Sequence, residues 1–400
     1  MKVLFVCHRV PYPPKRGGKI RPFNIIKHLT EQGHRVTVAS LARSPAELEE
    51  AQGLAGHCER MVVEVIPDWI AWPRMVAWLP TTRPSSFAYF YSPALARQLD
   101  GELGGGSYDL VFTHCSSVAP YVRAARGPLR VLDYGDIDSQ KWREYAQHRP
   151  QPLATGYKLE AVKLEQTERL LSRYADLCTC TTAGELASLR ALGVSTPSAW
   201  FPNGVDATFF SPDGSDYDPT LVAFVGRMDY FPNQQAVLTF AGTILPLLQR
   251  RRPEVRFEIV GADPPERIRR LASLPGVSVT GSVPDIRPYV RRAALTVAPL
   301  EIARGTQNKI LESMAIGVPV VCSRQAAGGV DAVVGEHLLV AQTAGEYVDA
   351  IASLVGSREA RMRLAAAARQ RAMTHHSWPA SMRRLDGLLD TAFAGRSVSR

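Results

Sequence analysis

Short apolar runs alternate with longer segments of helical periodicity along the whole chain. Runs such as Leu221–Val225 are continuously apolar, which is typical of parallel strands covered on both faces. We expect strands at 2–7, 35–40, 60–65, 108–113, 129–134, 175–180 and 198–201, and in a second series at 220–225, 255–260, 276–280, 294–298, 318–322 and 337–340. Strands and helices that alternate in this way predict an α/β protein with doubly wound parallel sheets.

The two series of strands are separated by a break rich in turn-forming residues. Asn203-Gly204 predicts a turn, and the polar segment 211–219 is typical of a linker. We therefore expect an N-terminal domain over 1–205, a second domain over 206–375 and a C-terminal helix over 376–395. Ligands of such sheets bind beyond the carboxyl ends of the strands, so functional residues are expected in the loops there.

Composition and charge narrow the possible functions. Of 400 residues, 46% are hydrophobic and 21% charged, which excludes a disordered or collagen-like protein. The net charge of +9 fits a nucleic acid, an anionic membrane or a phosphorylated substrate. No aromatic residues alternate with the basic clusters as base stacking would need, so no nucleic-acid partner is expected. The six cysteines lack the spacing of a disulfide framework, which favours a reducing, cytoplasmic location.

The most apolar stretch, 61–80, does not read as a membrane span because it carries charges and three prolines. No signal peptide is predicted either, since the chain opens directly on a strand pattern. The stretch holds Trp69, Trp72 and Trp78, half of the six tryptophans. Two interpretations stay open. It is a helix packed on its own sheet, or it is an amphipathic surface at a membrane interface or the mouth of a lipid-acceptor site, with Trp72 on the acceptor side.

Two features at strand ends of the first domain are candidates for substrate contacts. Gly17-Gly18 precede a helix and allow an anion or a sugar to approach the backbone closely. No G-x-G-x-x-G or P-loop motif accompanies them. The strand at 108–113 runs into His114, which is placed to donate to a substrate hydroxyl or carbonyl. For Gly17-Gly18 the alternative is an ordinary junction between a loop and a helix, and for His114 it is a purely structural role.

Acidic residues follow the next strand. Asp133 and Asp136 are acceptor-side candidates, with a hydrogen bond to loop backbone as the alternative for Asp133. Asp136-x-Asp138 has the form of a metal-binding pair, yet Asp138 or Ser139 is also an ordinary helix N-cap. We favour capping by Asp138 and expect no metal.

The second domain supplies the most informative segment, 298–323. Its pattern predicts a strand, a loop, a helix that ends at a glycine, and a second strand. Lys309 near the helix N-terminus suits a phosphate, and Glu312 can accept hydrogen bonds from vicinal hydroxyls such as those of ribose. An ordinary i,i+3 ion pair is the alternative. An earlier strand runs into Gly226-Arg227, and Arg227 could clamp a diphosphate or form a surface ion pair. The loop before the helix adds Arg304, Gly305, Thr306, Gln307 and Asn308 as candidates.

Together these segments resemble a bacterial glycosyltransferase of the GT-B fold, in the large retaining group called family 4. The resemblance covers nearly the whole chain. It is carried in order by Gly17-Gly18, the strand ending in His114, the segment 203–206, Gly226-Arg227, and the helix motif that begins at Lys309. The variants at 228–233 and 304–309 resemble more narrowly the sugar transferases encoded with exosortase-linked exopolysaccharide systems.

The resemblance implies two Rossmann-like domains facing across a cleft, with the C-terminal helix crossing back to the first. It implies retaining transfer of a sugar from a nucleotide-diphosphate donor, without a metal or other cofactor. From the tryptophan-rich patch 69–79 and the net charge we expect a saccharide or lipid-linked acceptor, and a location in the cytoplasm or on the cytoplasmic face of the inner membrane. Glu312 would bind the donor ribose, and Arg227 and Lys309 the diphosphate. His114 would lie near the transferred sugar, and Gly17-Gly18 near the diphosphate or the acceptor.

Two positions depart from the pattern of the family. Arg304 stands where many relatives have a glutamate, and Pro232 where many have a lysine. A carboxylate toward the donor sugar and a phosphate-binding cation are therefore missing, and Lys309 and Arg304 could supply the positive charge. Two alternatives remain. One is a sugar-nucleotide epimerase of the same fold, which would use Asp133 and Asp136 as acid and base. The other is an inactive GT-B scaffold that binds a nucleotide sugar or a lipid carrier.

Overall fold

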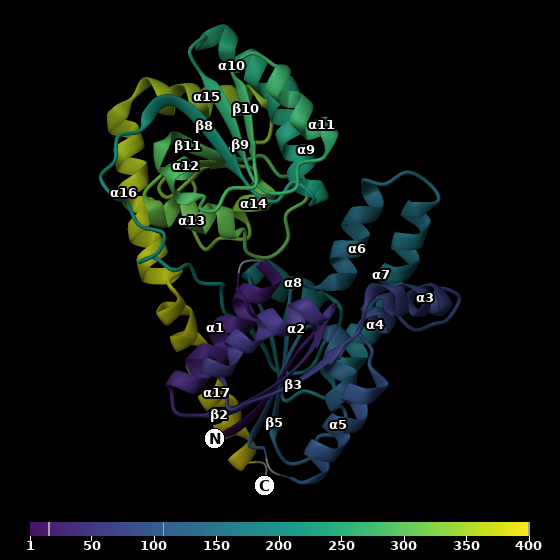
Figure 1. The fold of residues 1–400 in the computed structure, drawn as a ribbon. Helices are drawn as coiled ribbons and strands as arrows, with labels where there is room; N and C mark the ends of the chain where they lie inside the picture. Colours follow the sequence, from purple (N-terminus) through teal and green to yellow (C-terminus); the bar gives the residue numbers. More distant parts are fainter. Residues whose placement is uncertain (15–16, 107, 399–400) are drawn as a thin grey trace. The chain divides into compact units, whose positions relative to one another are not determined.

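The chain forms two compact units in its structure, a computed structural model that describes residues 1–14, 17–106 and 108–398 (Figure 1). The first unit comprises Met1–Phe201 together with Met382–Arg400, and the second comprises Pro202–Ser381. Each unit is built on one parallel sheet with helices packed around it. Both are therefore Rossmann-like α/β domains, as the alternation of strands and helices predicts.

The first unit contains a seven-stranded parallel sheet in the order β3-β2-β1-β4-β5-β6-β7. Its strands are β1 (Lys2–Cys7), β2 (Arg35–Ala42), β3 (Arg60–Val65), β4 (Leu110–His114), β5 (Leu129–Gly135), β6 (Leu177–Cys180) and β7 (Ser198–Trp200). Its helices are α1 (Gly17–Glu31), α2 (Pro45–Ala51), η1 (Gln52–His57), α3 (Asp68–Trp78), α4 (Ser85–Tyr89), α5 (Pro93–Gly104), η2 (Ser116–Val122), α6 (Asp138–Gln147), α7 (Leu153–Ser172) and α8 (Ala183–Ala191). The strand order reverses between β1 and β4, which is where ligands of open α/β sheets bind.

The second unit contains a six-stranded parallel sheet in the order β10-β9-β8-β11-β12-β13, which reverses between β8 and β11. Its strands are β8 (Asp218–Val225), β9 (Arg256–Val260), β10 (Val277–Gly281), β11 (Ala293–Ala298), β12 (Val320–Cys322) and β13 (Leu339–Val340). Its helices are α9 (Phe231–Thr239), η3 (Phe240–Ile244), α10 (Leu245–Arg251), α11 (Glu266–Arg269), η4 (Arg270–Ser273), α12 (Arg287–Arg292), α13 (Asn308–Ile316), α14 (Arg324–Ala327), α15 (Ala344–Gly356) and α16 (Arg358–His375). Every predicted strand is present, and the differences are confined to strand ends.

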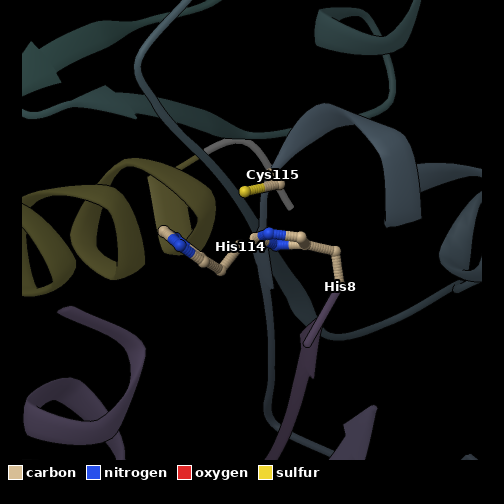
Figure 2. A group of neighbouring side chains, drawn as sticks. All are labelled: His8, His114 and Cys115. Carbon is tan, nitrogen blue, oxygen red and sulfur yellow. The ribbon is translucent and has the colours of Figure 1, made fainter. Parts of the chain in front are cut away.

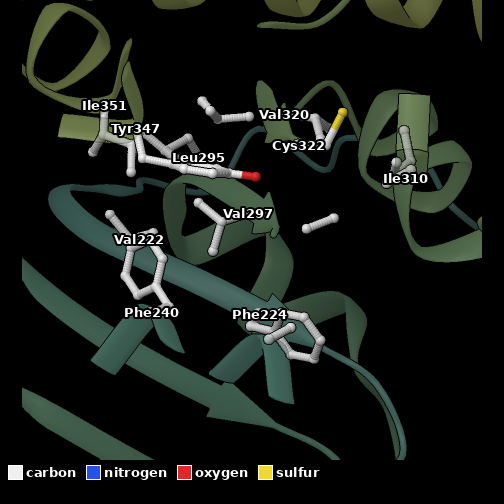
Figure 3. Packing of buried hydrophobic residues seen from close by; sticks show 14 of the residues in the cluster. Val222, Phe224, Phe240, Leu295, Val297, Ile310, Val320, Cys322, Tyr347 and Ile351 are labelled. Atoms are coloured by element: carbon white, nitrogen blue, oxygen red, sulfur yellow. The ribbon is translucent and has the colours of Figure 1, made fainter. Parts of the chain in front are cut away.

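The central strands are buried along nearly their whole length, because helices cover both faces of each sheet. Every residue of β11 is buried, and in β1 only Lys2 is exposed. Figure 3 shows the core of the second unit, where Phe224 of β8 and Val297 of β11 pack with Tyr347 of α15. Burying a side chain of this size stabilises the fold by about 1.5–3 kcal/mol. These cores hold the strand ends, and the loops after them, in fixed positions.

The segment between the two series of strands differs from its prediction. Gly204 does not lie in a turn but in a segment without regular secondary structure, and the next residue, Val205, forms an isolated bridge with Ser377. A Cβ on Gly204 would lie 2.6 Å from the Trp378 ring, so close packing is what requires glycine here. The expected linker 211–219 is held by ordinary tertiary contacts, since Arg291 binds the Asp213 carboxylate at 2.7 Å. Along the sequence, the first stretch of the first compact unit ends at Phe201, and the second unit begins at Pro202.

The last helix, α17 (Trp378–Val398), begins in the second unit and becomes part of the first from Met382 onward. Leu385 and Leu389 are buried. A hydrogen bond of 2.8 Å joins Asp386 to His28 of α1. The contacts of α17 therefore tie the end of the chain to the first unit, through helix α1 near its beginning.

Candidate functional site

The loop that leads into α13 contains buried polar atoms without protein partners. Thr306 Oγ1 and Asn308 Oδ1 are both buried, and neither has a hydrogen-bond partner in the described part of the chain. The N-cap residue Gln307 makes no side-chain cap; its amide donates instead to the Arg304 carbonyl at 3.1 Å. Buried polar groups are nearly always paired, and a helix N-terminus carries partial positive charge. The Thr306 hydroxyl and the helix N-terminus can donate to an anionic group, while Asn308 Oδ1 can only accept from a hydroxyl or an N–H, so the loop can receive a ligand that carries both kinds of group.

Glycine fixes the shape of this loop. Gly305 adopts φ +62°, and its carbonyl lies so close to Gly329 that a Cβ there would be 2.1 Å away. At the other end of α13, Gly317 adopts φ +82° as the C-cap, which confirms the predicted glycine stop. The polar atoms of the loop are thus held at the carboxyl edge of the sheet, beyond β11.

Lys309 lies in the first turn of α13 in a poorly solvated position. Its ammonium donates to Asn233 Oδ1 at 2.6 Å and lies 4.3 Å from the centre of the Phe224 ring. Burial lowers the pKa of Lys309 to about 7 and raises the pKa of Glu312 to about 7, while the attraction between the two groups opposes both shifts. A cation with so little solvation gains more from an anionic ligand than an exposed one does.

Asn233 also belongs to the site, although the sequence analysis named only the segment that contains it and not the residue itself. Its amide nitrogen donates to the Arg227 carbonyl at 2.8 Å while its oxygen accepts from Lys309, so it joins the two predicted cations. A Cβ on Gly226 would lie 2.7 Å from the Asn233 amide and 3.1 Å from the Lys309 ammonium. The unusual sequence of the segment 228–233 was the feature that could have pointed to Asn233. Pro232 of that motif lies in the first turn of α9.

Arg227 is half-exposed and is held by two carboxylates. It binds Asp229 at 2.7 Å and Asp263 at 2.6 Å, and both partners are exposed. Exposed ion pairs of this kind contribute only about 0–1 kcal/mol. A diphosphate could therefore displace them at little cost. The structure thus gathers the predicted residues of the second domain at the carboxyl ends of β8 and β11.

In the first unit, His114 belongs to a buried ion network at the ends of β4 and β5. His114 Nδ1 lies 2.7 Å from Asp133 Oδ2. Asp133 also accepts two bonds of 2.9 Å from the Arg21 guanidinium and one of 2.8 Å from Thr179. Burial by itself would raise the pKa of Asp133, but Arg21 and His114 hold it well below its ordinary value. Because this carboxylate can only accept, it fixes the proton on Nδ1 and leaves the Nε2 lone pair of His114 available.

This network corrects two predictions about the acidic residues. Asp133 is fully buried, so its side chain cannot contact an acceptor, and it orients His114 instead. Asp138 is not the cap of α6, because the helix begins at Asp138 itself and Ile137 holds the N-cap position. The buried N–H groups of Ile137 and Ser139 donate to carboxyl oxygens from neighbouring helices, at 2.7 and 3.2 Å. Those carboxylates belong to Glu185 of α8 and Glu168 of α7. 

The other candidates of the first unit lie closer to solvent. Gly17 and Gly18 are exposed in the first turn of α1, with open space where a Cβ would be, and residues 15 and 16 of the predicted loop lie outside the described residues. Asp136 is half-buried and accepts a bond of 3.0 Å from Thr181. Among the residues that the structure describes, the group of three or more side chains close enough to share a metal ion comprises His8, His114 and Cys115, and it does not include Asp136.

The tryptophan-rich segment forms α3, which has one packed face and one exposed apolar face. Ala71 is buried, and Trp78 packs against the core under α7. Trp69 is 75% exposed and Trp72 53% exposed, and Val76 is exposed as well. Lys163 of α7 donates to the Leu79 carbonyl at 2.7 Å, so the end of α3 lies against α7. Over the described residues, no helix is long and apolar enough to cross a membrane.

Comparisons with known proteins agree with this architecture. The model described as Glycosyltransferase Family 4 matches residues 16–209, and the one described as Glycosyl transferases group 1 matches residues 219–357. A search of curated proteins finds no match.

Several solved structures are similar over almost the full length of the chain. Sucrose-phosphate synthase from Thermosynechococcus elongatus is 17% identical, covering 99% of this chain and 100% of its own, with a TM-score of 0.75. Anabaena HepE in complex with UDP is 17% identical, covering 98% and 100%, with a TM-score of 0.69. TarM is 10% identical, covering 97% and 98%, with a TM-score of 0.70. With two glycosyltransferase models matching its two sheets in succession, the chain is a glycosyltransferase of the GT-B fold, with domains of the family 4 and group 1 types.

Proposed function

We propose that this glycosyltransferase moves a sugar from a nucleotide-diphosphate donor to a saccharide or lipid-linked acceptor, with retention, in exopolysaccharide or cell-surface glycan synthesis. The observation that carries the donor assignment is the pair of buried, unpartnered atoms on Thr306 and Asn308, two residues that lie just before Lys309 in the chain at the N-terminus of α13. UDP is the first nucleotide to test, because the similar HepE structure holds UDP and, in another crystal, UDP-glucose.

Different residues of the second unit bind different parts of the donor. Lys309 and the N-terminus of α13 bind the diphosphate, and Arg227 joins them by exchanging its aspartate partners for phosphate oxygens. Glu312, one turn further along α13, accepts hydrogen bonds from the ribose hydroxyls. Arg304 adds positive charge where many relatives carry a carboxylate. Because Arg304 replaces that carboxylate, other groups must recognise the donor sugar.

The chemistry requires stabilisation of a leaving diphosphate. The bond between the anomeric carbon and the phosphate oxygen breaks, and its electron pair goes to that oxygen. The acceptor oxygen bonds to the same face of the anomeric carbon, and its proton passes to the leaving phosphate. Preorganised charge of the kind that Lys309 and the α13 N-terminus offer is worth several kcal/mol in such a step. We assign no metal to it.

His114 serves the transferred sugar through its Nε2 atom, which can accept a hydrogen bond from a sugar hydroxyl. Asp133 and Arg21 are positioning residues, because they act only by fixing the imidazole. An epimerase would need acid and base carboxylates at the sugar. The burial of Asp133 removes one of the two that the sequence offers.

We propose further that the exposed face of α3 rests on an anionic lipid surface and brings the enzyme to a lipid-linked acceptor. Trp69 and Trp72 present large apolar area there, and Arg83 lies 5.4 Å over the Trp78 ring beside them. Tryptophan and arginine together are typical of interfacial segments. Flotation with anionic liposomes should be lost in the double variant W69S/W72S and kept in L274S, which removes an exposed leucine from the second unit. Equal flotation of both variants would refute membrane binding by this face.

The donor assignment is tested by thermal denaturation with UDP, GDP, ADP and dTDP, each with EDTA and with Mg²⁺. A nucleotide at a hundred times its dissociation constant adds about 2.7 kcal/mol, which raises the melting temperature by about 5–10 °C for a domain of this size. We expect the shift for one nucleotide, in EDTA as well, and its loss in Lys309→Met and Glu312→Gln. Arg250→Gln, an exposed charge on α10, is the matched control. No shift with any nucleotide would favour the inactive scaffold.

A further inference from the structure

Three side chains with metal-binding atoms gather at the carboxyl ends of β1 and β4. His8 follows β1 directly, His114 is the last residue of β4 and Cys115 comes next. The two strands are neighbours, with Cys7 in register with His114. One ligand atom from each of the three lies within 4.8 Å of the others (Figure 2).

Each of these side chains has a ligand atom to which no group in the described part of the chain is bonded. Asp133 holds the Nδ1–H of His114, which leaves Nε2 with its lone pair. The same arrangement, a carboxylate behind a histidine, orients the ligands of zinc sites. The Nδ1 atom of His8 is buried and has no hydrogen-bond partner anywhere in the described residues. The Cys115 side chain is half-buried beside it, so the cluster has access to solvent.

The backbone supports this arrangement of side chains. Cys115 adopts φ +79°, a left-handed conformation that is uncommon for any residue except glycine. Its N–H donates to the Asp133 carbonyl at 2.8 Å, so the same residue that orients His114 also holds the backbone of Cys115. Uncommon backbone of this kind is concentrated at functional sites.

We propose that His8, His114 and Cys115 form a binding site for Zn²⁺ or a similar thiophilic divalent cation. Two imidazoles and one thiolate leave the fourth tetrahedral position for water or an incoming ligand. Tetrahedral zinc bonds of about 2.0–2.3 Å put ligand atoms about 3.3–3.6 Å apart, so small side-chain rotations would close the cluster. As the metal–sulfur bond forms, the Cys115 thiol gives its proton to solvent, and the two neutral histidines keep theirs. Mg²⁺, which prefers oxygen ligands, is excluded.

A bound metal would also regulate the enzyme. It would occupy the Nε2 atom of His114, which is the atom we assign to the donor sugar, so the metal-loaded protein would be inhibited. This second step rests on the proposed function, whereas binding of the metal does not.

The test uses Co²⁺ as a spectroscopic substitute for Zn²⁺ on the full chain, after removal of any polyhistidine tag. We expect one equivalent of Co²⁺, a thiolate-to-cobalt charge-transfer band and the visible bands of a tetrahedral site, all displaced by Zn²⁺. The charge-transfer band should vanish in Cys115→Ser and persist in Cys58→Ser, a half-buried cysteine elsewhere in the same unit. Absence of the band in the natural chain, or its persistence in Cys115→Ser, would overturn the proposal.

A second variant covers the possibility that Cys115→Ser does not fold, as judged by circular dichroism. His8→Gln should weaken Co²⁺ binding by at least about tenfold, since even second-shell partners of metal ligands are worth about 10–100-fold. Unchanged Co²⁺ affinity in folded His8→Gln would count against the site. UDP binding is measured on the same samples: a protein that binds UDP and no Co²⁺ refutes only the metal site, and the reverse refutes only the donor assignment. Zn²⁺ should inhibit transfer by the natural chain and not by Cys115→Ser.

Discussion

Lys309 should take up a proton when the nucleotide binds. In the free protein, burial beside Phe224 lowers its pKa to about 7, so at pH 8 about nine in ten molecules carry a neutral amine. A diphosphate against the ammonium favours the charged form and raises the pKa again. Only the protonated lysine attracts the anion. UDP affinity therefore falls as the pH rises above 7 and is about tenfold weaker at pH 8 than at the low-pH limit.

Titration calorimetry at pH 8 measures this proton directly. UDP binding is followed in two buffers, HEPES and Tris, whose ionisation enthalpies differ, and the difference in heat gives the number of protons exchanged. The UDP phosphates are fully ionised at pH 8 and contribute none. We expect uptake of about 0.9 proton by the natural chain. In Lys309→Arg we expect no uptake but retained binding, because arginine stays charged at this pH.

Glu312 is the group that could confuse this result, since burial raises its pKa to about 7 as well. At pH 8 it is mostly ionised already, and it stays ionised when it accepts hydrogen bonds from the ribose hydroxyls, so it should contribute little to the proton uptake. Two results would refute the reasoning. One is UDP binding by the natural chain without proton uptake at pH 8. The other is equal uptake in Lys309→Arg, which would place the proton on another group.

Three further predictions concern the framework of the two sites. Asp133→Asn leaves Arg21 buried without its counter-charge and should cost about 3–5 kcal/mol in urea unfolding, measured by fluorescence. Gly226→Ala should weaken UDP binding and slightly lower the melting temperature, because its Cβ would meet the Asn233 amide at 2.7 Å and the Lys309 ammonium at 3.1 Å and would displace both. Gly317→Ala should lower the free energy of unfolding by about 1 kcal/mol, since the residue adopts φ +82°, and it should leave UDP affinity unchanged.

The fold could be predicted from the sequence because its signal is local and repeated. Each strand is a short apolar run, and each helix has its own periodicity and caps, such as Gly317 after α13. The sequence-based predictions were wrong where the role of a residue depends on a contact with a residue far away in the sequence. Gly204 is required by Trp378, and the start of α6 is capped by Glu168 and Glu185 in place of Asp138. No spacing rule connects positions that only the tertiary fold brings together.

The candidate sites divide in the same way. The loop and helix around Lys309 are continuous in sequence, so their residues could be named, and their roles stay predictions until nucleotide binding is measured. The partners that give each group its chemistry come from elsewhere in the chain. Asn233 reaches Lys309 from α9, and Arg21 reaches Asp133 from α1. His8 and Cys115 read as unremarkable residues after two separate strands, and only the order of the sheet places them together.

Polar groups at the two sheet edges differ in whether they already have partners, and this difference separates supporting groups from binding groups. At the edge of the first unit, Asp133 has partners on both of its oxygens, so this carboxylate has no capacity left and can only orient its neighbours, whereas His8 Nδ1 at the same edge is buried without a partner in the described residues. At the edge of the second, Thr306 and Asn308 have buried oxygens without partners among the residues that the structure describes, and Lys309 is held at a lowered pKa. Such groups lower stability in the free protein. Their cost is offset only when a ligand pairs with them, which is why unsatisfied polar atoms indicate the donor site better than the charge count does.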